Sequence, residues 1–493
     1  MLPATTAEAA RRFAERIAYV SDDGRTLTYA DLDRISDEVA VGLARRGVGE
    51  GSVVALVLPP GPEYLLAYLA AAKLGAITAG VNDRLSTRER DAVLAQAAPA
   101  LVITAPGFAP EHHDALEVPV GDAPDARLVP LRVEGASPPP LPDDTDRPVA
   151  IIFTSGTTGL PKGALYGNRQ LAFITHTDIG DAWDGGGRSF SGTSFAHLGF
   201  MTKLPGNLRR GGTTFIMQRW RADDALALLS RERMTTVAGV PSQIALMLRR
   251  PDFDSYDLES VGFIIVGGGP VTPGLAEEAR RRFGARLATR YSCTEAGIGL
   301  GTAFDAPDED AIVSVGRPHA SVELAVLDSD DRPVAAGEIG EVCLRSDAVM
   351  TGYWRDPDAT RAAFTAGGFV RTGDLGWVDD VGRLRLVGRS KEMYVRGGYN
   401  VYPVEVEGVL SSHPGVAAVA MVPRADPVMG EIGVAVVVPR DPDAPPTLAE
   451  LRDHGRAQLA AYKLPEQLRL TGALPLTAAE KIDRRALARE VEQ

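Results

Sequence analysis

Short apolar runs alternate with segments of helical spacing through much of the chain, and this alternation constrains the fold more than any other feature. In the first hundred residues, helical spacing at 30–47, 62–74 and 86–98 is interleaved with apolar runs at 52–58, 76–80 and 100–104. Strands separated by helices usually pair in parallel, and the helices then cover both faces of the sheet. The pattern therefore predicts an α/β fold.

The same alternation returns after a Pro- and Asp-rich loop at 136–147, beginning with the apolar strand PVAIIFT. From about 312 to 388, short strands with close turn signals replace it, which favours antiparallel β structure. The last hundred residues return to mixed helices and strands. We therefore predict a large N-terminal domain (1–388) of βα-layered sheets with a small β-barrel-like subdomain, followed by a small, mobile α+β C-terminal domain (389–493).

Composition narrows the classes of function and location. A net charge of −13 supplies no general attraction to nucleic acid or to an anionic membrane. Two cysteines, Cys293 and Cys343, are too few for a disulfide framework or a four-thiolate zinc site. The spacing of residues 1–20 predicts an amphipathic helix without the apolar centre of a signal peptide, and no apolar run approaches the roughly 20 residues that span a bilayer. We expect a cytoplasmic protein with no integral membrane segment and no nucleic-acid partner.

The segment TSGTTGLPKG at 154–163 carries the strongest chemical signal. Its small and hydroxylated residues directly after a strand expose backbone N–H groups, beside hydroxyl donors and one ammonium, and such a loop binds polyphosphate. It is not a Walker A loop, because Lys162 lies between Pro161 and Gly163 instead of in a Gly-Lys-Ser/Thr sequence. The predicted phosphate-binding residues are Thr154, Ser155, Gly156, Thr157, Thr158, Gly159 and Lys162.

Two acidic residues stand in positions where a nucleotide site needs them. Glu295 follows a predicted strand in a Gly-rich segment, where a lone carboxylate can hold Mg²⁺ together with ATP phosphates. Asp374 occupies a tight Thr-Gly-Asp turn, where a carboxylate can accept hydrogen bonds from ribose hydroxyls. Each also has an ordinary structural interpretation, as a surface Glu or as an Asx-turn residue.

In its motifs the chain resembles the adenylate-forming superfamily of acyl-CoA synthetases, amino-acid-activating domains and beetle luciferases, whose phosphate loop is TSGTTGxPKG. The resemblance covers nearly the whole chain and continues in order through YSCTEAG at 291–297, TGYW at 351–354, RTGDLG at 371–376, GRSKEMYVRGGYNVYPVEVE at 388–407 and LPLTAAEKIDRRAL at 474–487.

The resemblance implies a role for each matching nucleotide-site residue. Glu295 and Thr154 serve Mg²⁺, Thr294 contacts phosphate and Tyr291 packs on adenine, while Asp374 and Arg389 bind ribose and Gly268 and Gly269 line the cofactor site.

The C-terminal motifs imply further roles in catalysis. Lys481 matches the lysine that bridges the carboxylate and the α-phosphate during adenylation, although a solvated tail lysine is the alternative, and Glu480 stands where the family usually has Gly. Lys391 matches the hinge about which the small domain rotates. Gly397, Gly398 and Tyr399 match the face that receives the pantetheine arm of CoA, although two glycines alone also indicate a β-turn.

The acyl site is less defined by sequence. FAHLGF at 195–200 keeps a histidine, His197, which either lines the channel between carboxylate and thiol or is an ordinary core residue. The segments GVPSQI at 239–244 and AGIGLG at 296–301 are small and apolar, with no obvious partner for a second charge. They favour a neutral-tailed fatty or cyclic carboxylic acid.

These features together favour an acyl-CoA synthetase that uses ATP, Mg²⁺ and CoA and works through an acyl-AMP intermediate. An acyl-AMP ligase that loads a carrier protein is the first alternative. A non-catalytic nucleotide-binding protein is a second, and a luciferase-type oxidase shares the same motifs. We expect a monomer or a homodimer.

Overall fold

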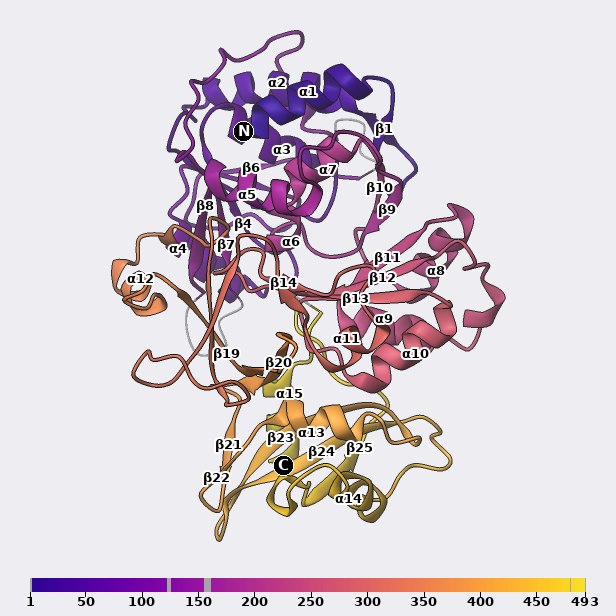
Figure 1. Ribbon diagram of the computed structural model, residues 1–493. Coiled ribbons are helices and arrows are strands. Elements are labelled where there is room, and N and C mark those ends of the chain that lie inside the picture. The colour runs from indigo at the N-terminus through magenta and orange to yellow at the C-terminus, as the bar shows by residue number, and fades with distance from the viewer. Residues whose placement is uncertain (1, 122–125, 155–160, 479, 493) are drawn as a thin grey trace. The chain divides into compact units, whose positions relative to one another are not determined.

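The computed structural model describes residues 2–121, 126–154, 161–478 and 480–492 (Figure 1). It contains two compact units, each assembled from separate stretches of the chain. Met1–Thr235, Cys293–Ile298 and Arg345–Phe364 form the first unit, and Thr236–Ser292, Gly299–Leu344 and Thr365–Gln493 form the second.

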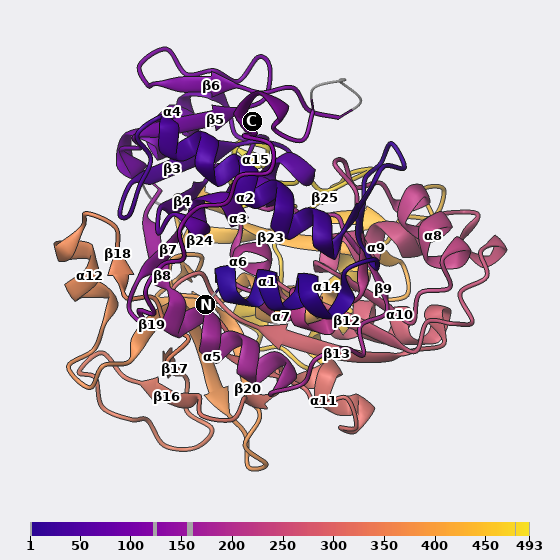
Figure 2. The same ribbon diagram turned by 90° about the horizontal axis from the view of Figure 1, so that it is seen from above.

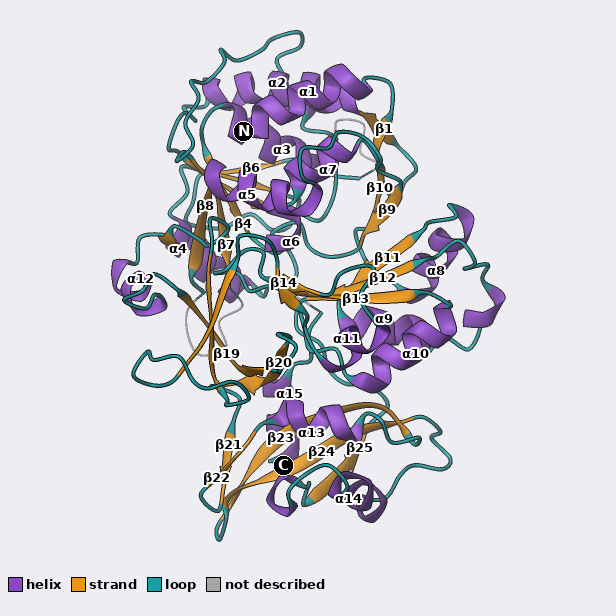
Figure 3. Cartoon of the chain, viewed as in Figure 1, coloured by secondary structure: helices purple, strands orange, loops and turns teal. Residues whose placement is uncertain are grey.

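A seven-stranded sheet is the centre of the first unit (Figure 3). Its strands, in spatial order, are β18 (Gly352–Tyr353), β8 (Gly163–Gly167), β7 (Pro148–Phe153), β4 (Ile77–Gly80), β3 (Val53–Val57), β5 (Leu101–Thr104) and β6 (Ala115–Glu117). The five strands from β7 to β6 are parallel to one another. Strand β8 pairs antiparallel with β7, and β18 pairs antiparallel with β8. The predicted parallel α/β sheet is therefore confirmed.

Three helices of the first unit lie close to the predicted ranges 30–47, 62–74 and 86–98. They are α2 (Tyr29–Arg45), α3 (Pro62–Lys73) and α4 (Thr87–Ala97). The other helices of this unit are α1 (Leu2–Phe13), α5 (Asn168–Ile179), α6 (Leu198–Met201), α7 (Leu204–Arg210), α8 (Ala222–Arg231) and α12 (Pro357–Ala363). Helix α2 starts with a capping box, in which the Thr28 side chain accepts from Asp31 N–H and the Asp31 carboxylate accepts from Thr28 N–H. Helix α3 is buried along its whole length. Its last residue, Lys73, pairs with Asp33 at 2.7 Å and Asp37 at 2.5 Å, and this ion pairing joins α3 to α2.

A second sheet in this unit includes part of the N-terminal segment for which only a helix was expected. The helical pattern predicted over residues 1–20 ends at Phe13, and β1 follows at Ile17–Val20. This strand lies between β2 (Thr26–Thr28) and β10 (Thr213–Ile216), with β9 (Arg188–Ser191) beyond. Pairing with a distant strand therefore overrides the local helical pattern. Figure 2 shows α1 lying beside α7, with which it packs.

A five-stranded sheet opens the second unit. Its strands are β11 (Thr236–Gly239), β12 (Phe263–Gly267), β13 (Arg286–Tyr291), β14 (Leu300–Gly301) and β15 (Arg317–Pro318), of which the first three are parallel. The accompanying helices are α9 (Pro241–Leu248), α10 (Pro273–Phe283) and α11 (Asp308–Val313). The βα alternation predicted for this region is confirmed.

The predicted antiparallel region follows as a four-stranded sheet. Its order is β16 (Glu323–Leu327), β17 (Gly340–Arg345), β19 (Val370–Val378) and β20 (Leu384–Arg389), with antiparallel pairing from β17 to β20.

The last hundred residues form a sheet and three helices, and they have a hydrophobic core of their own. The strands are β21 (Tyr394–Arg396), β22 (Tyr399–Val401), β23 (Val416–Asp426), β24 (Gly430–Pro439) and β25 (Gln467–Leu470), and the helices are α13 (Pro403–Leu410), α14 (Leu448–Arg456) and α15 (Arg484–Val491). One buried cluster draws all its members from between Tyr394 and Leu464. The domain boundary at residue 389 stays a prediction.

Three short 3-10 helices complete the described elements, at Val129–Leu131, Phe253–Ser255 and Ala461–Lys463. No described helix combines the length and the apolar character needed to cross a bilayer.

Candidate active site

The two ends of the predicted phosphate loop are hydrogen-bonded to each other. Residues 155–159, which include the predicted Ser155, Gly156, Thr157, Thr158 and Gly159, lie outside the described residues. Thr154 N–H donates to the carbonyl of Lys162 at 2.9 Å, and Lys162 N–H donates to Thr154 Oγ1 at 3.4 Å. The antiparallel strands β7 and β8 thus bring Thr154 and Lys162 together at one end of the sheet.

The Thr294–Glu295 segment is held by main-chain contacts within the first unit. The Tyr166 hydroxyl donates to the carbonyl of Thr294 at 2.7 Å, and Met350 N–H donates to the carbonyl of Glu295 at 2.9 Å. Gly297 has a φ of +71°, and a Cβ there would lie 2.4 Å from the carbonyl oxygen of Ala348. Only glycine permits this close approach, which seats the segment against residues 345–350.

Tyr353 orients the Glu295 carboxylate. Its hydroxyl donates to Glu295 Oε1 at 2.8 Å, and the Lys162 ammonium lies 5.0 Å from the centre of its ring. Burial, together with the negative charge of Glu295, raises the pKa of Tyr353 well above its ordinary value. The tyrosine therefore stays protonated and donates to Glu295 throughout the physiological pH range.

The donor set around Glu295 fits Mg²⁺ that arrives with a nucleotide. The described residues contain no group of three or more His, Cys, Asp or Glu side chains that could hold a metal ion. Mg²⁺ is usually bound through one or two carboxylates plus substrate phosphates instead of an all-protein cage. The single carboxylate of Glu295, oriented by a neutral donor, suits that arrangement, with the Thr154 hydroxyl as the other predicted ligand.

A second polar cluster lies within the second unit and contains three predicted nucleotide-site residues. Asp374 on β19 is opposite Arg389 on β20, whose Nε donates to Asp374 Oδ1 at 2.8 Å. The Tyr291 hydroxyl, at the end of β13, donates to Asp374 Oδ2 at 2.7 Å. The Asp374 residue is 7% exposed, so both of its carboxylate oxygens are oriented in a largely buried position.

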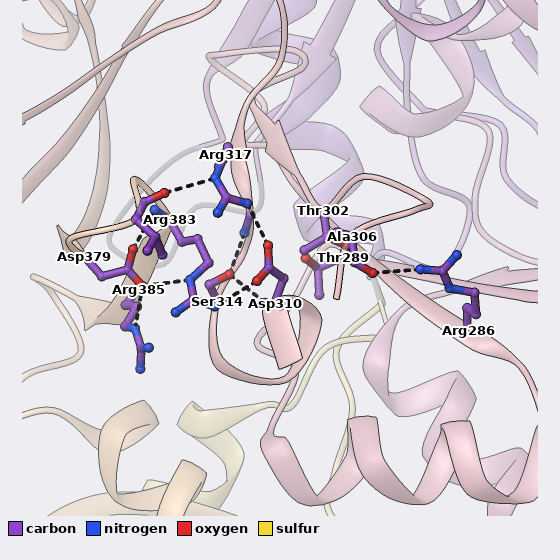
Figure 4. Close-up of polar contacts among 12 residues, drawn as sticks. Arg286, Thr289, Thr302, Ala306, Asp310, Ser314, Arg317, Asp379, Arg383 and Arg385 are labelled. Atoms are coloured by element: carbon purple, nitrogen blue, oxygen red, sulfur yellow. Dashed lines mark hydrogen bonds and ion pairs between the residues drawn. The ribbon is translucent and has the colours of Figure 1, made fainter. Parts of the chain in front are cut away.

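An ionic network around two buried carboxylates, Asp310 and Asp379, supports the strand pair that carries this cluster (Figure 4). Arg383, which directly precedes β20, donates to Asp379 at 2.8 Å and to Asp310 of α11 at 2.8 Å. Arg317 donates to the other oxygen of Asp310 at 2.7 Å, and Arg385 reaches Asp379 at 3.3 Å. Figure 4 shows Arg383 between the two carboxylates. The network therefore ties α11 and β15 to the β19–β20 hairpin.

The remaining predicted cofactor-site glycines have local structural partners. Gly268 and Gly269 follow β12, and a Cβ at either would lie 3.4 Å from Val240 or Pro241 at the start of α9. Gly397 and Gly398 form the two-residue turn between β21 and β22, with φ values of +54° and +85°. The expected β-turn is therefore present there, and the CoA contact stays a prediction.

Three other predicted residues of the C-terminal motifs have described positions: Lys391 and Lys481 lie in loops, and Tyr399 lies on a strand. Lys391 falls between β20 and β21 and is exposed. Tyr399 begins β22, is 57% exposed and stacks on Tyr462 with ring centres 4.6 Å apart. Lys481 is exposed in a loop after β25 that is closed by pairing of Leu476 with Ile482. Their predicted roles are not tested by these positions.

His197 has a polar partner in the first unit. Its Nε2 lies 3.0 Å from Asn82 Nδ2, just after β4. Beside it, the rings of Phe195 and Phe200 stack with centres 3.7 Å apart, and both residues are buried. His197 thus stands at the N-terminus of α6, with its ring next to the amide of Asn82.

The predicted residues fall into separate groups. Thr154, Lys162, Thr294, Glu295 and His197 belong to the first unit, and Gly268, Gly269, Tyr291, Asp374, Arg389, Lys391, Gly397, Gly398, Tyr399 and Lys481 to the second. Sequence reasoning missed Tyr353 and Asn82. Tyr353 stands in the quoted motif TGYW, and Asn82 follows a predicted buried strand, which is where polar functional residues of parallel sheets gather.

Comparison with known families identifies the class of protein. Residues 6–354 match the AMP-binding enzymes, and residues 405–481 match the AMP-binding enzyme C-terminal domain. The chain belongs to the AMP-binding enzyme family, and the expected membership of the adenylate-forming superfamily is confirmed.

Individual relatives extend over almost the whole chain. The feruloyl-CoA synthase of Amycolatopsis sp. is 34% identical over 491 residues, covering 96% of this chain and 95% of that protein. The fatty acid–[acyl-carrier-protein] ligase ScoC of Streptomyces coeruleorubidus is 32% identical over 482 residues, covering 94% of this chain and 92% of that protein. The crystal structure of ATP-bound MatB from Rhodopseudomonas palustris superimposes with a TM-score of 0.88 at 26% identity, covering 100% of this chain and 99% of that one.

Proposed function

We infer that this chain is an ATP-dependent acyl-CoA synthetase, an AMP-forming acid–thiol ligase that works through an acyl-AMP intermediate. The observation that carries the inference is Glu295 held by the neutral donor Tyr353, with Lys162 over the same ring, in a chain that matches the AMP-binding enzymes. The Tyr291–Asp374–Arg389 cluster supports a nucleoside site. ATP, Mg²⁺ and CoA are its cofactors and substrates.

In the first half-reaction, a carboxylate oxygen of the acid attacks the α-phosphorus of ATP. The bond from that phosphorus to the bridging oxygen breaks, and pyrophosphate leaves with the electron pair. Both reactants are anions, so cations aimed at the developing charge lower the barrier. We assign Lys162 to the phosphates and Lys481 to the carboxylate and α-phosphate. Glu295 would hold Mg²⁺, which would neutralise phosphate charge.

In the second half-reaction, the sulfur of CoA attacks the acyl carbon and gives up its proton. The bond from the acyl carbon to the AMP oxygen breaks, so that the thioester and AMP are released. We propose that the domain 389–493 rotates about Lys391 and presents Gly397, Gly398 and Tyr399 to the pantetheine arm. The two-residue glycine turn and the exposed Tyr399 ring support that role, and we assign His197 to the channel between acid and thiol.

The proposed substrate is a neutral-tailed carboxylic acid, and aromatic acids are the first to test. The buried, stacked rings of Phe195 and Phe200 beside His197 support an apolar acyl site. The name of the feruloyl-CoA synthase relative points to an aromatic acid for that protein, and its similarity to this chain runs end to end. Saturated fatty acids and alicyclic acids belong in the same screen.

The test is a screen of acids by pyrophosphate and AMP release, with and without CoA. A suitable acid should give AMP release that depends on CoA, together with the matching acyl-CoA. A dicarboxylic acid serves as the control for a second charge and should react poorly. Absence of acyl-AMP with every acid in the screen would refute the enzyme class.

The alternative is an acyl-AMP ligase that loads a carrier protein, and the similarity to the ScoC ligase favours keeping it. In that case acyl-AMP accumulates whether or not CoA is present, and it is discharged onto a carrier protein bearing a phosphopantetheine arm. The two acceptors therefore separate in one assay, because only the CoA ligase forms acyl-CoA.

We also propose that the enzyme works in the cytoplasm as a monomer or a homodimer. Cys293 and Cys343 are both buried thiols that are not joined in a disulfide, which is in keeping with a reducing compartment. Sedimentation of the purified chain would decide its oligomeric state.

A further inference from the structure

The residue before the proposed adenylation lysine has an unusual backbone conformation. Glu480 has a φ of +60°, in the left-handed region that residues with a Cβ seldom adopt. The related motifs usually have glycine here, and glycine takes this conformation without steric cost. A glutamate that keeps it therefore needs contacts that compensate, and the following inference, which rests on the proposed ligase function, concerns those contacts.

The loop around Glu480 is closed on itself by Thr477. Glu480 N–H donates to the carbonyl of Thr477 at 2.9 Å, and Thr477 N–H donates to the carbonyl of Lys481 at 2.7 Å. Lys481 N–H in turn donates to Thr477 Oγ1 at 3.3 Å. The left-handed residue lets the chain reverse so that Lys481 can return to Thr477, and these hydrogen bonds tie Glu480 and Lys481 to Thr477.

This loop is attached to the first turn of α9 through Glu480. The Ser242 hydroxyl donates to the main-chain carbonyl of Glu480 at 2.5 Å, and Gln243 Nε2 donates to Glu480 Oε2 at 2.5 Å. Gln243 is 3% exposed, and its Oε1 accepts from Val240 N–H at 3.2 Å. Because the amide oxygen is occupied in this way, the amide N–H₂ group points at the glutamate.

Two other contacts join the last hundred residues to α9 and α10, but neither involves the loop. Arg249 donates to the carbonyl of Gly472 at 3.1 Å, and Arg440 pairs with Glu278 at 3.1 Å. Both arginines are exposed, and exposed ion pairs and hydrogen bonds stabilise only weakly. Glu480 is thus distinguished by its buried partner and by its position next to Lys481.

We propose that Glu480 is a positioning residue for adenylation, which docks on Ser242 and Gln243 and so fixes the direction of the adjoining Lys481. Both its carbonyl and its carboxylate are held, so the peptide that leads into Lys481 has little freedom. Residues 239–244 are also a predicted wall of the acyl site. The contact therefore places the ammonium in a set relation to the segment that receives the acid.

The contact matters in only one half-reaction. In the proposed second half-reaction the domain 389–493 rotates, so the loop leaves α9 and Glu480 has no role. Loss of the glutamate should lower kcat for acyl-AMP formation with little change in KM for ATP, because the nucleotide contacts remain. Thioester formation from supplied acyl-AMP should be unaffected. A purely structural role would slow both half-reactions alike.

The experiment compares single-turnover acyl-AMP formation with thioester formation from supplied acyl-AMP. Glu480→Ala removes the acceptor and should slow adenylation by about tenfold, the value of one hydrogen bond to a charged group. Glu480→Gln keeps an acceptor oxygen for Gln243 and should restore most of the rate. Asp453→Ala, which removes an exposed acid of α14, is the matched control and should leave both half-reactions unchanged.

A pair exchange tests the contact itself. Gln243→Glu keeps the acceptor for Val240 but sets two carboxylates against each other, so it should slow adenylation. Adding Glu480→Gln should recover the rate, because an amide again faces a carboxylate. An exchanged pair no faster than Gln243→Glu alone would overturn the proposal, as would equal slowing of both half-reactions by Glu480→Ala. If the wild-type chain forms no acyl-AMP at all, the proposed function itself is refuted and this inference with it.

Discussion

The proposed ribose contact of the Tyr291–Asp374–Arg389 cluster can be tested in two ways, by changing Asp374 and by removing a hydroxyl from the nucleotide. Asp374 holds Arg389 Nε with one oxygen and the Tyr291 hydroxyl with the other. A carboxylate has about four acceptor positions, so the remaining ones can take the two ribose hydroxyls. Asp374→Asn preserves the volume but replaces one acceptor oxygen with a donor group.

The expected loss follows from these contacts. A hydrogen bond to a charged group contributes about 1.5–3 kcal/mol, and each 1.4 kcal/mol corresponds to about a tenfold change in affinity. Asp374→Asn removes at least one such bond to ribose, so kcat/KM for ATP should fall by about 10- to 150-fold. KM for the carboxylic acid should change little, because the cluster has no proposed contact with the acyl group.

A cycle with modified nucleotides separates ribose binding from general damage. Wild-type enzyme should lose activity on 2′-deoxy-ATP or 3′-deoxy-ATP, while Asp374→Asn should show almost no further loss from removing the same hydroxyl. Tyr291→Phe is the matched control, because it removes a hydroxyl from the cluster and keeps the carboxylate, so the deoxynucleotide penalty should persist. Equal penalties in wild type and Asp374→Asn, measured by pyrophosphate release, would refute the assignment to ribose.

Three other perturbations give distinct results. Tyr353→Phe removes the donor that orients Glu295, so the Mg²⁺ concentration for half-maximal rate should rise about tenfold; an unchanged Mg²⁺ titration would argue against a metal role. Arg383→Met removes one partner from each of two buried carboxylates, which keep Arg317 and Arg385, and should lower the free energy of unfolding in urea by about 1.5–3 kcal/mol. Burial alone would raise the pKa of Asp379, but hydrogen bonds from Arg383 lower it from 3.8 to about 2. The stabilisation from this carboxylate is therefore complete above pH 3.8 and is lost as the pH falls towards 2. Arg383→Met should weaken this dependence of the free energy of unfolding on pH. Lys481→Ala should slow adenylation by about 100-fold and spare thioester formation from supplied acyl-AMP, and equal losses would show that the lysine has another role.

Sequence periodicity predicted the parallel sheets well, because buried strands and amphipathic helices leave strong local patterns. The predicted strand at 52–58 is observed at Val53–Val57, and the predicted helix at 62–74 at Pro62–Lys73. The strand at Gly163–Gly167 was missed because its sequence, GALYG, has little strand character of its own. A Cβ at Gly163 would lie 2.5 Å from the Ile151 side chain on the neighbouring strand, so the glycine is favoured by side-chain packing, which a local pattern does not reveal.

The final helix shows the same limit. Half of residues 484–491 are charged, and no helix was predicted there. Arg484 is held by Glu407 at 2.5 Å and by Glu392 at 3.2 Å, two residues about 80 or more positions earlier in the chain. Long-range ion pairs of this kind place a polar segment that has only a short apolar stripe, Leu487 and Val491, to bury.

Sequence motifs predicted Glu295 and Asp374 as carboxylates of the candidate site. The structure shows that their hydrogen-bond partners differ. Glu295 is oriented by a neutral tyrosine hydroxyl, which fixes its direction and leaves its negative charge in place. Asp374 accepts from a tyrosine hydroxyl as well, but it also pairs with the guanidinium of Arg389, which offsets its charge.

A cation is attracted by net negative charge, whereas neutral hydroxyl groups need only acceptor oxygens in the right direction. Glu295 therefore suits Mg²⁺, and Asp374 suits a sugar. The proposed roles of the two carboxylates therefore differ because their hydrogen-bond partners differ. A substitution that removes the charge of Arg389 should weaken the preference of Asp374 for a neutral ligand.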